Sequence, residues 1–211
     1  LFVVASIFVS LSLAPILLSA VPMPAAEITK PMGLSALCRA SPLGTAGMFL
    51  LGAVFGAKSG MAAVYATGAG FSVDQVALFV SMLYAGSLAL QFPIGWISDR
   101  MDRRLLILAL SAAGAAATMG GWLSDTLWPV MAAAFVAGGL ANSLYSLLIA
   151  HTNDFLARED MASASGGLVF IYGLGAISGP LIAGAAMERA GNAAFWPVVG
   201  ALFLLVAVYA A

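Results

Sequence analysis

The 211-residue sequence contains few charged residues: they make up 8% of it, whereas a soluble globular domain carries about 25%. A water-soluble surface cannot be built from so few charges. Hydrophobic residues account for 63% of the chain instead. The composition therefore excludes a soluble domain and indicates a protein that lies in a lipid bilayer.

Cysteine and histidine occur once each, and the net charge is close to zero. A single cysteine, Cys38, excludes an intrachain disulfide, and we interpret it as a free thiol in a polar linker. His151 alone cannot supply the ligands of a metal site, so we expect neither a metal nor another cofactor. A net charge of −1 provides no basic field for nucleic acid.

Long apolar runs dominate the sequence. Seven can be drawn, each near the ~20 residues that a helix needs to cross ~30 Å of hydrocarbon. They cover residues 1–20, 42–69, 73–97, 105–123, 127–150, 162–187 and 192–211. Segments in lipid must satisfy their own backbone hydrogen bonds. We therefore predict an all-α polytopic membrane protein with seven transmembrane helices.

Positive charge is unevenly distributed between the loops. One set of alternate loops holds six lysines and arginines, and the other holds only Arg189. The six are Lys30, Arg39, Arg100, Arg103, Arg104 and Arg158. Because positively charged loops stay in the cytoplasm, we predict that residues 21–41, 98–104 and 151–161 and the C-terminus are cytoplasmic.

The chain divides into three parts. Residues 1–20 lack the basic start of a secretory signal peptide, and we interpret them as the last helix of an absent N-terminal half. Residues 21–41, which contain several prolines, form a cytoplasmic linker, and residues 42–211 form a six-helix unit.

A faint internal repeat runs through the six-helix unit. An offset of 87 residues pairs Gly52 with Gly139, Gly86 with Gly173, Pro93 with Pro180, and Lys58 with Tyr145. Each half would contain three helices, so the second half would be inverted relative to the first. Inverted three-helix repeats are a known construction of transporters.

Residues 95–104 form a charged island between two apolar runs, with five charged residues in the last six positions. The pattern Gly95-x-x-x-Asp99-Arg100-x-x-Arg103-Arg104 resembles the signature loop of the major facilitator superfamily. That loop joins the second and third helices of each six-helix half. Asp102 departs from the family pattern, which has glycine there. The resemblance implies the C-terminal half-bundle of a bacterial-type transporter, including the end of its sixth helix, in the inner membrane.

The resemblance also implies that this loop is a conformational latch. The Asp99 carboxylate can cap the N-terminus of a neighbouring helix. Arg100, Arg103 and Arg104 can bind carboxylates or the carbonyls at helix C-termini. The alternative is that the arginines only fix the membrane topology.

Lys58 lies near the middle of an apolar span, where a lysine costs roughly 2.5–3.5 kcal/mol. Such a residue usually faces a bundle interior or an aqueous cavity. It is a candidate for binding an anionic substrate group or for proton coupling. The alternatives are a lysine that extends toward the interface, or one paired with a carboxylate of the missing half. No aspartate or glutamate of this chain falls at mid-membrane, so a coupling carboxylate would come from that half.

Polar residues also mark the span 127–150. Asn142, Tyr145 and Ser146 share one helix face and are candidates for hydrogen bonds to a substrate or to another helix. Tyr65 and Gln91 are weaker candidates of the same kind. We interpret His151 as an interface residue or a titrating group.

The last motif is Gly175-x-x-x-Gly179-Pro180-x-x-x-Gly184. Its small residues predict close helix packing, and Pro180 predicts a kink. It loosely resembles a glycine- and proline-rich motif in helix five of some antiporters.

These features predict a secondary active transporter that moves a small solute by alternating access, with proton-coupled efflux and uptake both open. Its partners would be the lipid bilayer, the missing six-helix half, a small-molecule substrate and protons. Phosphate-loop and intramembrane-protease arrangements are absent from the sequence, so we do not expect an enzyme. A non-transporting membrane scaffold or receptor is the alternative.

Overall fold

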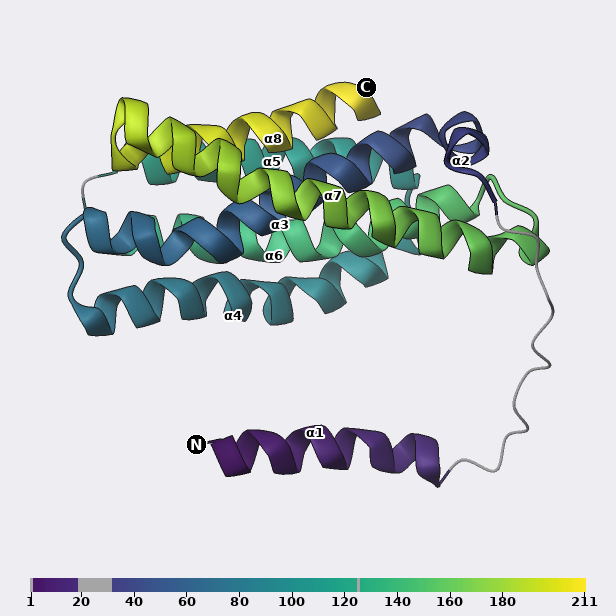
Figure 1. Ribbon diagram of the computed structural model, residues 1–211, viewed down its shortest axis with the longest axis horizontal. Helices are drawn as coiled ribbons and strands as arrows, with labels where there is room; N and C mark the ends of the chain where they lie inside the picture. The colour runs from purple at the N-terminus through teal and green to yellow at the C-terminus, as the bar shows by residue number, and fades with distance from the viewer. Residues whose placement is uncertain (1, 19–31, 125) are drawn as a thin grey trace.

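The computed structural model describes residues 2–18, 32–124 and 126–211, and the regular secondary structure within these ranges is helical (Figure 1). The helices are α1 (Phe2–Leu17), α2 (Leu34–Ala40), α3 (Pro42–Gly68), α4 (Val73–Ser98), α5 (Arg103–Trp122), α6 (Leu127–Asn153), α7 (Arg158–Ala190), the 3₁₀ turn η1 (Asn192–Ala194) and α8 (Phe195–Ala210). Residues 19–31, which hold the first part of the predicted linker, lie outside the described residues.

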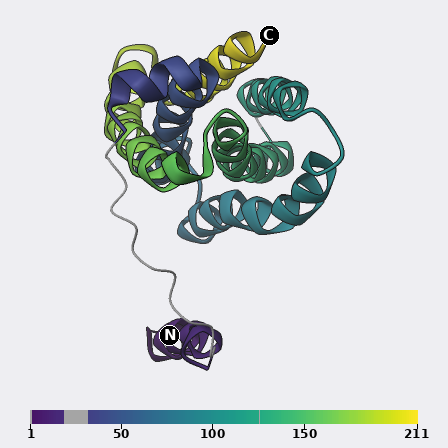
Figure 2. The ribbon, with the colours of Figure 1, turned by 90° about the vertical axis from the view of Figure 1, so that its right-hand side faces the viewer.

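Six helices are long and apolar enough to cross a membrane, namely α3 to α7 and the continuous segment formed by η1 and α8. Figure 1 shows them side by side along the long axis of the molecule. The predicted all-α polytopic fold is confirmed. The first predicted span corresponds to α1, which has 16 residues, fewer than the ~20 of a full crossing. Figure 2 shows α1 outside the six-helix bundle.

The six helices form two triplets, and each helix packs mainly on a helix of the other triplet. The first triplet is α3, α4 and α5, and the second is α6, α7 and α8. The first helix of each triplet packs most extensively on the second helix of the other, so that α3 lies on α7 and α6 lies on α4, while α5 packs on α8. Two inverted three-helix repeats related by a pseudo-two-fold axis have this exchange of partners.

Glycines bring the backbones of α3 and α7 into contact. A Cβ atom at Gly175 would overlap the carbonyl oxygen of Phe49, and one at Gly179 would overlap that of Ala53. Gly52 on α3 is pressed in the same way against the carbonyl of Tyr172. Small residues at four-residue spacing allow this approach.

The other two positions of this motif, Pro180 and Gly184, differ in how closely they are packed. A Cβ at Gly184 would lie 3.5 Å from the Met61 methyl carbon, an ordinary contact. Pro180 lies within α7 and faces α3, where its ring approaches Gly60. The tight part of the stripe therefore ends at Pro180.

The contact between α4 and α6 uses the same device. Gly86 lies against the carbonyl of Phe135, and Gly138 lies against that of Leu83. The hydroxyl of Ser87 donates a hydrogen bond to the Gly138 carbonyl at 3.0 Å. Gly173, the repeat counterpart of Gly86, has no atom within 4 Å of a Cβ position, so the repeat is not preserved at this contact.

Candidate functional site

Lys58 is buried inside the bundle, in the middle of α3. Its side chain is 6% exposed. The Nζ atom lies 5.5 Å from the ring centroid of Phe55 and 5.3 Å from that of Tyr84 on α4. No carboxylate of the described residues lies within ion-pair distance of it. Aromatic faces therefore provide the electrostatic support for this ammonium group within the described chain.

A cavity of about 150 Å³ opens beside this lysine. We call it the Lys58 cavity; its lining residues are Leu51, Phe55 and Lys58 of α3, Ala141, Asn142 and Tyr145 of α6, and Tyr172 of α7. Three of the four predicted substrate candidates, Lys58, Asn142 and Tyr145, thus meet at one cavity. Since α3 and α6 begin the two repeats, the cavity lies where the triplets join.

The polar groups of the cavity are held in place by neighbours. The Asn142 side-chain amide donates a hydrogen bond to Oε1 of Gln91 on α4, at 3.2 Å. Tyr145 packs edge-on against Tyr172, with ring centroids 5.0 Å apart. Asn142 is itself exposed, so its amide oxygen stays available to accept a hydrogen bond from a ligand.

Ser146 lies in a neighbouring cavity, not in the Lys58 cavity. That second cavity, also about 150 Å³, runs between α4 and α6 toward the charged loop, and Gln91, Asp99 and Arg103 line it with Ser146. Gln91 therefore connects the two spaces, because its side chain also binds Asn142. The shared helix face predicted for the three residues spans both cavities.

The structure adds two tyrosines, Tyr84 and Tyr172, to the predicted site residues. Tyr84 contacts Lys58, and Tyr145 and Tyr172 line its cavity. Three of the five tyrosines in the chain therefore lie at this site. Tyrosines in the middle of apolar spans are the sequence signal that points to them. Tyr65 lies elsewhere: its ring stacks on Phe195, with centroids 5.1 Å apart, in a buried aromatic cluster.

The arginines of the charged loop bind groups at the ends of helices in the same bundle. The Arg100 guanidinium lies 3.9 Å above the Trp96 ring and donates to the Trp96 carbonyl at 2.8 Å. Arg103 forms an ion pair with Asp154 at the end of α6. These arginines therefore bind helix ends of their own half. Arg104 does the same, since its Nε donates to the Ala210 carbonyl of α8 at 2.8 Å.

The structure gives a reason for aspartate at position 102, where the family pattern has glycine. It is the N-cap of α5, and its carboxylate accepts a hydrogen bond from the Leu105 amide at 3.0 Å. Its φ of −58° lies in a range open to any residue, so the turn does not need glycine. Asp102, and not Asp99, caps the helix that follows.

Asp99 is exposed and ends α4. Its carboxylate makes no ion pair or hydrogen bond within the described chain. Together with Gln91, Gly95 and Trp96 it borders an open groove of about 490 Å³ along α4. Of the charged latch residues, Asp99 is the one whose side chain makes no hydrogen bond or ion pair within the described chain.

The whole arrangement can be compared with known proteins. A family model described as the Major Facilitator Superfamily matches residues 43–211. The chain belongs to the Major Facilitator Superfamily. The match begins at the start of α3 and covers the six-helix bundle, so the predicted family and its C-terminal half are confirmed.

Bacterial superfamily members resemble the chain at moderate identity. The MFS-type transporter YfkF of Bacillus subtilis is 30% identical over 132 residues, which cover 63% of this chain and 34% of YfkF. An MFS-type transporter of Yersinia pestis is 25% identical over 171 residues, 79% of this chain and 43% of that protein. The matched segments cover less than half the length of these relatives. Superfamily membership and the six apolar spans identify an integral membrane protein.

Proposed function

We propose that this chain forms the C-terminal half of a secondary transporter and that a second six-helix half completes the pathway. Support comes from the superfamily match and from relatives more than twice as long as the matched segment. Residues 1–20 would end the first half, and residues 21–41 would be the cytoplasmic linker. Transport would follow alternating access, in which the two halves rock around a site near the bilayer midplane.

The transported solute is a small molecule with an anionic group, and Lys58 binds that group. The observation that carries this proposal is a buried lysine that faces a cavity and has no carboxylate partner among the described residues. A charge-assisted hydrogen bond from the ammonium to a ligand oxygen would offset the cost of keeping the lysine in the membrane. Asn142 and Tyr145 would orient the ligand through their amide and hydroxyl groups.

Asp99 acts as the latch between the halves. Arg100, Arg103 and Arg104 each already bind a group of this bundle, whereas the exposed Asp99 carboxylate binds none in the described chain, so we assign to Asp99 the contact across the halves. It would bind a helix N-terminus or a cation of the first half when the cytoplasmic side is closed, and release it when that side opens. The arginines would hold the neighbouring helix ends together, so that these ends move with Asp99 as one unit.

The cytoplasmic end of the bundle is the one that carries the arginine loop. The excess of Lys and Arg in alternate loops supports this orientation. The linker and the C-terminus then face the cytoplasm. The bacterial sources of the relatives support a location in the inner membrane.

A solute screen with the full-length protein tests the proposal. Proteoliposomes would be offered small carboxylates, phosphate esters, neutral solutes and organic cations, with and without a pH gradient. We expect transport of an anionic solute by the wild type and its loss in Lys58→Ala. Transport with unchanged rate and pH dependence in Lys58→Ala would refute the role of Lys58, and transport of none of the four classes would refute the proposed transporter.

A further inference from the structure

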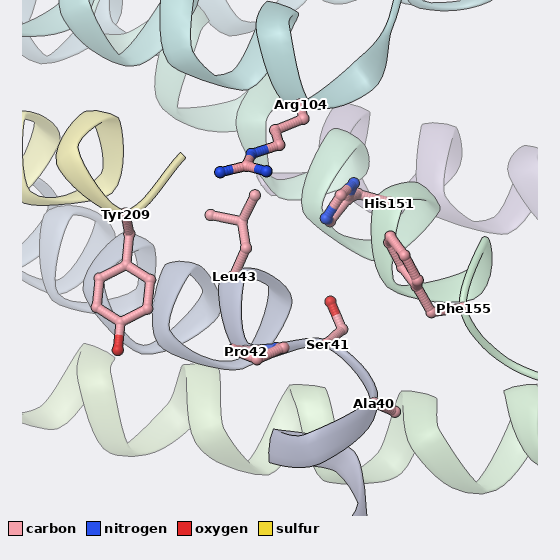
Figure 3. A pocket seen from close by; sticks show the side chains of 8 residues that line it. All are labelled: Ala40, Ser41, Pro42, Leu43, Arg104, His151, Phe155 and Tyr209. Atoms are coloured by element: carbon pink, nitrogen blue, oxygen red, sulfur yellow. The ribbon is translucent and has the colours of Figure 1, made fainter. Parts of the chain in front are cut away.

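A separate cavity of about 280 Å³ lies at the arginine-loop end of the bundle, away from Lys58. We call it the end cavity; its lining residues are Ala40, Ser41, Pro42, Leu43, Arg104, His151, Phe155 and Tyr209. Figure 3 shows these residues gathered from the end of α2, the starts of α3 and α5, the end of α6 with the residues just after it, and the end of α8. Arg104 is the one charged residue among them.

His151 is the buried polar group that points to a ligand. Its side chain is 8% exposed, and it makes no hydrogen bond within the described part of the chain. Its ring packs edge-on against Phe155, with centroids 5.0 Å apart, and Figure 3 shows its nitrogens on the side toward Arg104. The ring nitrogens line the cavity without a partner in the described chain, so a group inside the cavity can hydrogen-bond to them.

Further unused donors surround the same space. Arg104 uses only Nε, in its bond to the Ala210 carbonyl, which leaves four guanidinium N–H groups. Ser41 is buried, and its oxygen accepts from the Gly44 amide at 3.2 Å, so its hydroxyl hydrogen is free to donate.

The N-terminus of α3 adds a positive partial charge to this set. Pro42 has no N–H, and the Leu43 amide makes no backbone hydrogen bond in the described chain. Helix N-termini of this kind favour anions. Two carboxylates that act on His151 electrostatically already have partners, since Asp102 caps α5 and Asp154 pairs with Arg103.

We propose that the end cavity binds the phosphate of an anionic membrane phospholipid. A phosphate offers several oxygens, which matches donors arriving from a guanidinium, an imidazole, a hydroxyl and a helix N-terminus. The exposed rings of Phe155 and Tyr209 at this end of the spans suit the lipid–water interface. The cavity is also larger than a phosphate group alone, which leaves space for the glycerol part of a lipid.

Lipid binding by the full-length protein tests this site. The purified protein would be equilibrated in mixed micelles of phosphatidylglycerol and phosphatidylcholine, and its bound lipids measured by native mass spectrometry. We expect the wild type to retain phosphatidylglycerol preferentially. Arg104→Gln and His151→Phe should each weaken that binding about tenfold. Arg158→Gln is the matched control, because Arg158 lies at the same end but does not line the cavity.

Two results would overturn the proposal. One is wild-type retention of phosphatidylglycerol in both Arg104→Gln and His151→Phe. The other is thermal stabilisation by inorganic phosphate without any preference for phosphatidylglycerol, which would make the site one for a free anion. Since Arg104 also binds α8, His151→Phe, which keeps the ring shape, provides the test if Arg104→Gln lowers stability.

Discussion

Lys58 on α3 and Tyr145 on α6 line the same cavity and occupy equivalent positions of the internal repeat, 87 residues apart. The repeat thus places a cation and a phenol on the two helices that begin the triplets. Neither side chain depends on the other for a hydrogen bond within the described chain. Both therefore remain available to a ligand at the junction of the repeats.

The Asp102 cap gives a stability prediction. Removing an N-cap side chain costs about 1 kcal/mol, whereas Asp and Asn cap almost equally well. Asp102→Ala should lower the unfolding temperature of the full-length protein in detergent, and Asp102→Asn should leave it nearly unchanged. Equal unfolding temperatures for Asp102→Ala and the wild type would show that the cap does not stabilise α5.

Gly86 and Gly173 form a matched pair for helix packing. A methyl group at Gly86 would overlap the Phe135 carbonyl, whereas Gly173 is open. We expect Gly86→Ala to destabilise the protein by about 1–3 kcal/mol through overpacking, and Gly173→Ala to be tolerated. Thermal unfolding and expression yield would measure the difference. If the two variants behave alike, the contact between α4 and α6 is not as close as described.

The latch predicts a change in accessibility when Asp99 loses its charge. A cysteine replacing Ser146, which lines the cavity leading to Asp99, would report opening of the cytoplasmic side in a background without other cysteines. Asp99→Asn should raise its labelling rate from that side about fivefold or more. Asp102→Asn removes a carboxylate from the same loop but keeps the cap, so it serves as the control. Equal effects of the two substitutions would contradict a specific role for Asp99.

Hydropathy predicts most of the fold but does not predict where the helices begin and end. The predicted span 127–150 became α6, which continues to Asn153, and the span 162–187 became α7, which runs from Arg158 to Ala190. Hydropathy detects only the part of a helix that lies in hydrocarbon. Polar residues beyond the hydrocarbon remain helical because their backbone N–H and C=O groups are still hydrogen-bonded along the helix. Hydropathy does not predict the short α2, because its seven residues are too few for a span and only Leu37 among them is buried.

The site was predictable where an unusual residue stood out. Lys58 was conspicuous because a charge at mid-span is costly, and Asn142 and Tyr145 followed from helical spacing. Tyr84 and Tyr172 were not selected, because their relation to Lys58 depends on how α4 and α7 pack against α3. The same limit applied to Asp102, whose capping role appears only in the geometry of the turn.

The most direct test of the account measures charge preference at Lys58. Once the solute screen has identified an anionic substrate, transport of that substrate would be compared with transport of its neutral amide analogue. We predict that Lys58→Gln lowers the anion-over-amide ratio of kcat/KM about tenfold or more, because the charge-assisted hydrogen bond is lost. Lys58→Arg should retain most of the preference. An unchanged ratio in Lys58→Gln would contradict the central claim that this lysine binds the anionic group of the substrate.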